Sequence, residues 1–418
     1  MKKTYLILLT LMFAASLGCQ PEGTEPDKLS TPTSPGLPFQ SQSQAQPSSS
    51  APSPAPLPAF AIDRVHDDAA AIISGLAVGS DAARKVEGTA SWQAFAKSIG
   101  GHWSAFDSAI LVPMKKWAGE ELRDSRLVTK TLFYPFGGPD FVTASAFYPE
   151  ARKTILMGLE AVGNLPNFDK ETPEWRDGFF QDFETILSDF LKRGYFVTKH
   201  MNESFGRGRV DGALPVMLFF LKRTGHSVVA LRRLTVNDKG KWTESPYSVQ
   251  RRTHKWPNGI RVDFVQTGDS VVRSVYYFSC DISDAVMTKD SPLYHLYDGL
   301  EAVTTFIKSG SYLLHYADFS NLRTMILGKS LFVLEDDTGI PYRYFKRQGW
   351  PIQLYGAYAK PIEDFPALVE QKDLKAAYED PAGNVKPLPF HFGYRWVSKV
   401  DNLLLMKRPP AKAGTAGN

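Results

Sequence analysis

The chain has 418 residues, of which 43% are hydrophobic and 12% are aromatic. This composition supplies a sizeable core, which excludes a protein that is disordered over its whole length. The 48 Lys and Arg residues nearly balance the 44 Asp and Glu residues, for a formal net charge of +4. So small a net charge excludes a protein that coats a polyanion, and we expect no nucleic-acid partner.

The N-terminus has the pattern of an export signal. Lys2 and Lys3 precede an apolar run over residues 5–15, which is too short to cross a bilayer as a helix, since that takes about 20 residues. The run ends at Ser16-Leu17-Gly18-Cys19. This resembles a bacterial lipoprotein signal, in which a small residue precedes the Cys that receives lipid, although Ser16 and Leu17 differ from the residues usual there. We therefore expect a signal peptide over residues 1–18.

The resemblance implies that Cys19 carries lipid, such as palmitate, and that its partner is the membrane of a bacterial cell envelope. Gln20 follows the cysteine, and by resemblance to enteric lipoproteins the absence of Asp there favours the outer membrane over the inner one. The alternative is an ordinary secretory signal cleaved near Ala15, which leaves Cys19 as a free thiol. Only Cys280 remains as a second cysteine, and it lies in an alternating apolar run typical of a buried residue.

The composition divides the mature chain into segments. In residues 20–58, ten of the 39 positions are Pro and eight are Ser, so residues 19–58 are expected to form a disordered tether. Residues 59–125 are expected to form a small helical module, because residues 61–76, 91–98 and 103–122 carry apolar side chains at helical spacing. Pro113 is expected to kink or split the third helix. The body follows over residues 126–410, with a disordered tail over residues 411–418.

Within the body, residues 127–134, 141–148 and 153–160 are apolar, β-branched-rich runs with turn residues between them. They predict a three-stranded antiparallel meander covered on both faces. Thr172, Pro173 and Gly194 delimit a helix over 173–193. The remaining elements were predicted from apolar periodicity and turn residues: helices at 212–223, 293–307, 320–329 and 371–379, and strands at 227–236, 260–266, 271–280, 331–335, 352–358, 390–396 and 402–406.

The order of these elements predicts an α+β fold, with largely antiparallel sheet packed against several amphipathic helices. Helices and strands do not alternate one for one, which disfavours a doubly wound parallel sheet. The strands at 260–266 and 271–280 flank Thr267-Gly268-Asp269-Ser270, and this turn sequence predicts a hairpin.

The search for catalytic motifs is mostly negative. The chain has no phosphate-binding loop, no GxSxG, no SxxK, no HExxH and no CxxC, so we expect no cofactor and no metal. His200 and Glu203 are three residues apart, a spacing that places two side chains on one face if the segment is a helix. They follow the apolar residues 195–197, which indicate a strand, and the alternative is a polar loop at a strand end.

An acidic segment, Glu335-Asp336-Asp337-Thr338-Gly339, follows an apolar strand. Its Asp-Thr-Gly resembles the active-site turn of aspartic proteases, but the chain has no second copy and Glu335 and Asp336 replace apolar residues of that family. Two hypotheses remain open for Asp336 and Asp337. They bind a ligand or cation, or they only end the strand, in which case Asn at both positions is expected to leave stability unchanged or slightly higher.

Two further segments bear on partners. Residues 251–256 (RRTHKW) form the densest basic cluster, for which the alternatives are a solvated loop or a contact with anionic lipid or a cell-wall polymer. The segments 136–141 (FGGPDF), 336–342 (DDTGIPY) and 354–358 (LYGAY) resemble segments of uncharacterised bacterial envelope proteins. That resemblance supports a single evolutionary unit and implies no activity.

Two functional hypotheses follow from the sequence. The first is a tethered, non-catalytic lipoprotein that binds a ligand, an envelope protein or a cell-wall partner. The second is a cell-envelope hydrolase whose active site is scattered along the chain, with its residues drawn from His200, Glu203, Asp140, Asp336 and Asp337.

Overall fold

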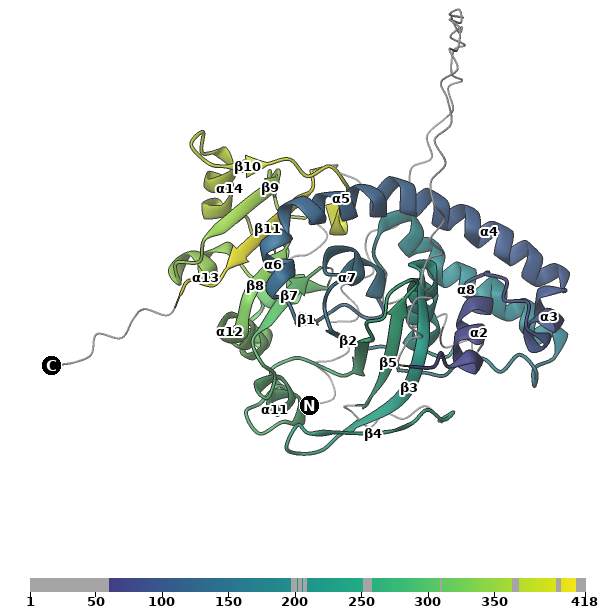
Figure 1. Ribbon diagram of the computed structural model, residues 1–418. Coiled ribbons are helices and arrows are strands. Elements are labelled where there is room, and N and C mark those ends of the chain that lie inside the picture. The colour runs from purple at the N-terminus through teal and green to yellow at the C-terminus, as the bar shows by residue number, and fades with distance from the viewer. Residues whose placement is uncertain are drawn as a thin grey trace, which may run out of the picture. The chain divides into compact units, whose positions relative to one another are not determined.

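The computed structural model (Figure 1) describes residues 60–196, 201, 205, 209–250, 258–308, 310–362, 368–395 and 400–410. The chain divides into two units between Pro58 and Ala59, and the second unit is the one described below. The predicted signal, Cys19 and the tether lie outside the described residues. So do His200, Glu203, the basic cluster at 251–256 and the tail at 411–418.

One mixed sheet of eleven strands runs through the unit, in the order β10-β9-β11-β8-β7-β1-β2-β6-β5-β3-β4. The strands in chain order are β1 (Thr131–Tyr134), β2 (Lys153–Gly158), β3 (His226–Val236), β4 (Trp242–Pro246), β5 (Asn258–Gln266), β6 (Arg273–Ser279), β7 (Val303–Ile307), β8 (Ser330–Glu335), β9 (Ile352–Gly356), β10 (Val385–Lys386) and β11 (Asn402–Lys407).

The centre and the flanks of the sheet differ in direction. The five central strands β8, β7, β1, β2 and β6 are parallel. On one side β5, β3 and β4 continue the sheet antiparallel, and on the other side β11 lies antiparallel between β8 and β9, with β10 parallel to β9. Most paired residues are therefore antiparallel, and the α+β class predicted from the sequence is confirmed.

Helices cover both faces of the sheet (Figure 1). The first core cluster includes side chains from α2 (Arg64–Ile73), α3 (Asp81–Glu87), α4 (Ala90–Phe106), α5 (Val112–Glu121), α7 (Phe141–Phe147), α8 (Pro173–Arg193) and α10 (Ala213–Arg223). The second includes side chains from α11 (Pro292–Asp298), α12 (Ser320–Lys329), α13 (Tyr342–Arg347) and α14 (Lys372–Glu379).

Strand residues alternate between these two clusters. Leu132 and Tyr134 of β1 belong to the first cluster, and Phe133 between them belongs to the second. Successive side chains of a strand point to opposite faces, so a strand buried on both faces is apolar at every position. The prediction that the sheet is covered on both faces is confirmed.

The N-terminal helices share the first core cluster with the sheet. A single π-helical turn, η1 (Asp107–Leu111), separates α4 from α5 just before Pro113. Proline lacks the N–H that continues the regular ladder, which explains the π turn at this point. The backbone stays helical from α4 through η1 into α5, so Pro113 changes the hydrogen-bonding pattern but does not split the helix in two. The short helix α6 (Arg123–Val128) then leads into β1.

The predicted antiparallel meander is wrong. Residues 141–148 contribute the helix α7 in place of a strand, and β1 pairs with β2 in parallel. Asp140 caps α7, since its Oδ1 accepts a hydrogen bond from the Thr143 N–H at 3.0 Å. The β-branched and aromatic composition of the run reflects complete burial, because a buried helix needs the same apolar side chains as a buried strand.

Two C-terminal predictions also need correction. The predicted helix at 293–307 is the helix α11 followed by the strand β7, and Gly299 caps the helix between them. The predicted strand at 390–396 is a coil with a short 3₁₀ turn, η4 (Gly393–Arg395), in the residues that the structure describes. Other 3₁₀ turns are η2 (Ser311–His315) and η3 (Ala317–Phe319).

Elements with strong local signals lie where the sequence placed them. The helix α8 spans Pro173–Arg193, with Thr172 accepting from the Trp175 N–H and Gly194 in the left-handed conformation. The hairpin of β5 and β6 and the helix α12 also agree with the prediction.

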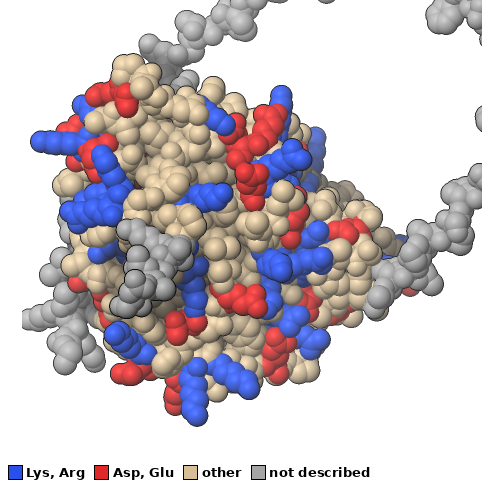
Figure 2. All heavy atoms as spheres, turned by 60° about the vertical axis from the view of Figure 1, so that its left-hand side comes forward, with Lys and Arg blue, Asp and Glu red and all other residues tan. Residues whose placement is uncertain are grey.

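The surface is mixed in charge. Figure 2 shows Lys and Arg interspersed with Asp and Glu on the face turned forward from the left-hand side of Figure 1. Among the described residues, no helix has the length and apolar character needed to span a membrane.

Candidate functional sites at the two edges of the central strands

The carboxyl ends of the central strands meet at one edge of the sheet, because these strands are parallel. The strand β1 lies between β2, which follows it in the chain, and β7, which comes much later. In open sheets such a reversal of strand order creates a crevice in which ligands commonly bind. The side chains that follow β1, β7 and β8 at this edge are therefore the first candidates for a site.

A buried ion pair joins the ends of β1 and β7. Lys308 follows β7, and its Nζ donates to Asp140 Oδ2 at 2.6 Å and to Thr143 Oγ1 at 3.0 Å. The two charged side chains are 3% and 4% exposed. The Tyr134 hydroxyl donates to the same Asp140 oxygen at 3.0 Å. Burial, followed by the charge of Asp140, raises the pKa of Tyr134 well above its usual value, so Tyr134 stays protonated.

The acidic turn after β8 is buried and has its own internal cation. Arg395 donates to both oxygens of Asp337, from Nε at 2.8 Å and from Nη2 at 2.6 Å. The Asn402 side chain adds a hydrogen bond from Nδ2 to Asp337 Oδ1 at 2.8 Å. This bidentate geometry is the preferred arrangement of a guanidinium and a carboxylate. Burial of the guanidinium lowers the pKa of Arg395, but the hydrogen bonds and charge of Asp337 raise it, and the net shift is upwards.

In the described part of the chain, neither Glu335 nor Asp336 forms an ion pair with a cation. Asp336 Oδ1 accepts from the Thr338 N–H at 2.9 Å, and Glu335 Oε2 accepts from the Ile340 N–H at 2.9 Å. Burial, and then the charge of Asp337, raises the pKa of Asp336 to about 7. Burial also raises the pKa of Glu335 well above its usual value. The turn therefore holds fewer negative charges than its three carboxyl groups suggest.

Asp336→Asn should make stability less sensitive to pH. The pKa of Asp336 is higher in the folded state than in the unfolded state. The protonated Asp336 side chain therefore contributes to the free energy of unfolding in full below the unfolded pKa, and this contribution is lost as the pH rises towards about 7. Asn does not titrate, and its Oδ1 accepts the same hydrogen bonds. The melting temperature of the variant, relative to the wild type, should therefore be higher at pH 8 than at pH 4.5.

Asp290→Asn is the matched control, because Asp290 is exposed. Its melting temperature should follow that of the wild type at both pH values. A constant difference between Asp336→Asn and the wild type across this range would show that Asp336 does not titrate there.

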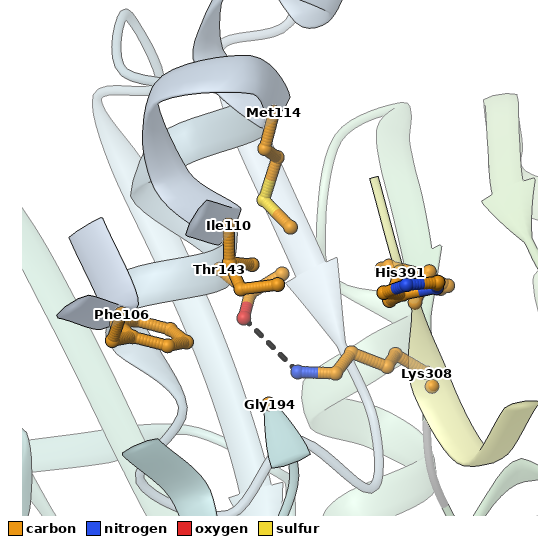
Figure 3. Close-up of a pocket in the computed structure, with 9 residues that line it drawn as sticks. Phe106, Ile110, Met114, Thr143, Gly194, Lys308 and His391 are labelled. Carbon is orange, nitrogen blue, oxygen red and sulfur yellow. Dashed lines mark hydrogen bonds between the residues drawn. The ribbon is translucent and has the colours of Figure 1, made fainter. Parts of the chain in front are cut away.

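A small cavity lies beside Lys308 at this edge (Figure 3). Its volume is about 10 Å³, room for about one water molecule. In Figure 3 the Lys308 side chain reaches Thr143. Phe106 and Ile110 lie on one side of this contact, and His391 lies on the other. The cavity thus combines an apolar wall with a lysine, a hydroxyl and an imidazole.

His391 is held by an acidic partner. Its Nδ1 lies 2.7 Å from Asp401 Oδ2, and Asp401 Oδ1 accepts from the Phe392 N–H at 2.8 Å. Asp401 is buried, whereas the His391 side chain is 45% exposed. A carboxylate on Nδ1 fixes the orientation of the ring, which is the arrangement that prepares a histidine for proton transfer.

A larger, basic cleft lies where β1 and β2 begin, at the amino edge of the central strands. Its volume is about 400 Å³, within the range of small-molecule sites. The Lys130 carbonyl accepts hydrogen bonds from the backbone N–H groups of Arg152 and Lys153, at 2.9 and 3.1 Å. These bonds link the start of β1 to the start of β2. The cleft is lined by Gly119, Arg123, Arg126, Leu127, Thr129, Lys130, Glu150 and Arg152.

The charge of the amino-edge cleft is uncompensated. Its one acidic side chain, Glu150, accepts from Arg126 Nε at 2.9 Å and is paired with that guanidinium. Arg123, Lys130 and Arg152 are exposed and form no ion pair with the residues that the structure describes. Three free cations around a concave surface attract anions and raise their local concentration.

The structure places the residues singled out in the sequence as follows. Asp140, Asp336 and Asp337 lie at the carboxyl edge, where the charges of both Asp140 and Asp336 act on Tyr134. Over the described ranges, no three His, Cys, Asp or Glu side chains are grouped as metal ligands. Cys280 is buried with a free thiol whose pKa burial raises, as expected of a small core residue.

Sequence reasoning missed several side chains of these sites. Lys308, Arg395 and the pair of His391 and Asp401 stand in no recognisable motif. The cleft cations come from two stretches of the chain, residues 123–130 and Arg152, and they are not consecutive in either, so no local run of basic residues marks them. A comparison with models of known protein families finds no match, and no curated protein is significantly similar in sequence.

Proposed function

We propose that this protein is an envelope lipoprotein, tethered through Cys19, whose body is a non-catalytic binder of an anionic ligand. The observation that carries the proposal is the amino-edge cleft, which is large enough for a small molecule and presents three cations without acidic partners in the described part of the chain. A phosphate or carboxylate group is the chemistry that such a cleft selects. Such groups occur on free metabolites, lipids and cell-wall polymers.

The carboxyl edge supports binding less well. Asp337 is paired with Arg395, and Lys308 with Asp140, so these charges already have partners. The cavity beside Lys308 has room for about one water molecule. A ligand of ordinary size therefore fits the amino-edge cleft and does not fit this cavity.

Removing the three free cations of the cleft should weaken anion binding. In the variant Arg123→Gln, Lys130→Gln, Arg152→Gln, the affinity for inorganic pyrophosphate measured by calorimetry should fall at least about tenfold, equivalent to ~1.4 kcal/mol. Arg126 is left in place because it neutralises Glu150. All three changes are at exposed positions, so the melting temperature should stay close to that of the wild type.

A matched control removes the same charge elsewhere. Lys346, Arg347 and Lys372 are exposed on α13 and α14 and lie outside the cleft. The variant with Gln at these three positions should bind pyrophosphate as the wild type does. Equal weakening in both variants would mean that net charge, and not the cleft, attracts the anion.

Cys19→Ser should release the protein from the membrane. A single acyl chain anchors only marginally, whereas a lipoprotein cysteine carrying more than one chain binds stably, at about 0.8 kcal/mol per buried CH₂ group. After cell fractionation, the Ser variant should appear in the soluble fraction or remain unprocessed. Metabolic labelling with a fatty-acid analogue should mark the wild type only, and labelling of the variant would refute lipidation at Cys19.

A second function, hydrolysis, is favoured by the pair of His391 and Asp401. In this alternative, Asp401 orients the ring and His391 removes a proton from a water molecule in the adjacent cavity. Turnover of p-nitrophenyl esters or phosphates by the wild type, lowered at least about 100-fold in His391→Gln, would support the hydrolase. Equal rates for the two proteins would leave the binding function as the better account.

A further inference from the structure

The rim of the amino-edge cleft carries an exposed apolar pair. Leu127 and Val128 end the helix α6, and they are 78% and 49% exposed. Leu127 lines the cleft together with Arg123 and Lys130. Large apolar side chains this exposed are few in the described residues, and here two are adjacent and lie beside free cations.

This combination matches the chemistry of an anionic bilayer surface. Lys and Arg bind lipid phosphates, while neighbouring apolar side chains enter the boundary between headgroups and acyl chains. A soluble anion uses the cations and gains nothing from Leu127 and Val128. A purely apolar partner leaves the three cations unpaired.

We propose that the amino-edge cleft and the Leu127–Val128 rim form a docking surface for anionic phospholipid. The inference rests on the proposed function, since the same cations hold the anion, and it names the headgroup phosphate as that anion. Basic residues near such a surface and apolar side chains at the headgroup boundary both favour reversible binding.

Vesicle sedimentation tests the inference directly. Residues 19–418 with Cys19→Ser lack both the covalent anchor and the apolar run of residues 5–15, so neither contributes to binding. This protein should sediment with vesicles of phosphatidylcholine that contain 30% phosphatidylglycerol. The amount that sediments with pure phosphatidylcholine should be at least about tenfold smaller. Binding should also fall in 0.5 M NaCl, because salt screens exposed charges.

Two variants in this background assign the contacts. Gln at positions 123, 130 and 152 should reduce vesicle binding at least about tenfold, and so should Leu127→Ser combined with Val128→Ser. The second variant should bind pyrophosphate as the wild type does, because it keeps all the cations. Val65→Ser combined with Val369→Ser is its control, since these valines are also exposed but lie outside the cleft.

The outcomes separate this inference from the proposed function. Pyrophosphate binding without vesicle binding overturns the membrane surface and leaves the anion-binding function standing. Vesicle binding that survives either variant, or that is equal for neutral and anionic vesicles, also overturns it. Absence of both pyrophosphate and vesicle binding overturns the inference and the proposed function together.

Discussion

Arg395→Ala should destabilise the protein by about 3 to 5 kcal/mol. Arg395 is the cation for Asp337, whose side chain is 2% exposed, and Asp336 lies next to it in the turn. Without the guanidinium, Asp337 keeps only the amide of Asn402 as its side-chain donor among the described contacts. For a body of this size the melting temperature should fall on the order of 5 °C, measured by calorimetry or circular dichroism.

The controls for this prediction separate charge from truncation. Arg347→Ala removes an exposed arginine and should change stability by less than about 0.5 kcal/mol. Adding Asp337→Asn to Arg395→Ala removes the stranded charge and should recover part of the loss. A cost below about 1 kcal/mol for Arg395→Ala would mean that water, and not Arg395, solvates Asp337.

The ion pair of Arg395 and Asp337 changes how the test for a cation bound by Asp336 and Asp337 is interpreted. The sequence predicts that Asn at both positions leaves stability unchanged or slightly higher if the turn is only structural. In the structure Asp337→Asn breaks a buried ion pair, so a loss of stability does not indicate a lost metal ion. The better measurement is the melting temperature of the wild type with and without millimolar Ca²⁺, which should be the same because Arg395 already neutralises Asp337.

Lys308→Met should lower the free energy of unfolding by a similar amount, about 3 to 5 kcal/mol. Met keeps the length and apolar stem of the side chain but removes the charge that faces Asp140. Because a buried carboxylate without a cation favours its neutral, protonated form, lowering the pH from 7 to 5 should recover part of the loss. Thermal unfolding at both pH values measures the effect.

Adding Asp140→Asn to Lys308→Met should restore much of the stability. Asn also caps a helix, so the N-terminus of α7 keeps its hydrogen bond to the Thr143 N–H. Lys346→Met, at an exposed position, should be close to neutral. A Lys308→Met loss that does not respond to pH or to Asp140→Asn would point to packing against Phe190 and Phe392, over whose rings the ammonium lies.

The candidate sites were partly visible in the sequence. Asp140, Asp336 and Asp337 stood out as carboxylates in turns after apolar runs, and the structure places them at one edge because β1 and β8 belong to the same set of parallel strands. Their partners did not stand out. Arg395 lies 58 residues beyond Asp337, and Lys308 lies 168 residues beyond Asp140.

Local chemistry determined the elements whose ends carry their own signals. Thr172, Pro173 and Gly194 delimit α8 without help from the rest of the chain, and the turn at 267–270 specifies the hairpin of β5 and β6. The order of helices and strands along the chain predicted the α+β class, and the apolar runs predicted a sheet covered on both faces. These features depend on contacts between residues close in sequence or on the total amount of apolar surface.

Tertiary structure decided the direction of β1 and β2, the helical state of residues 141–147 and the cations that pair with Asp140 and Asp337. An apolar run is equally suited to a buried helix or a buried strand, so packing between distant segments makes the choice. The basic cleft depends on the same cause, since α6 and the starts of β1 and β2 bring its cations together. Electrostatic attraction and repulsion act through space, so chain order alone does not show which charges meet.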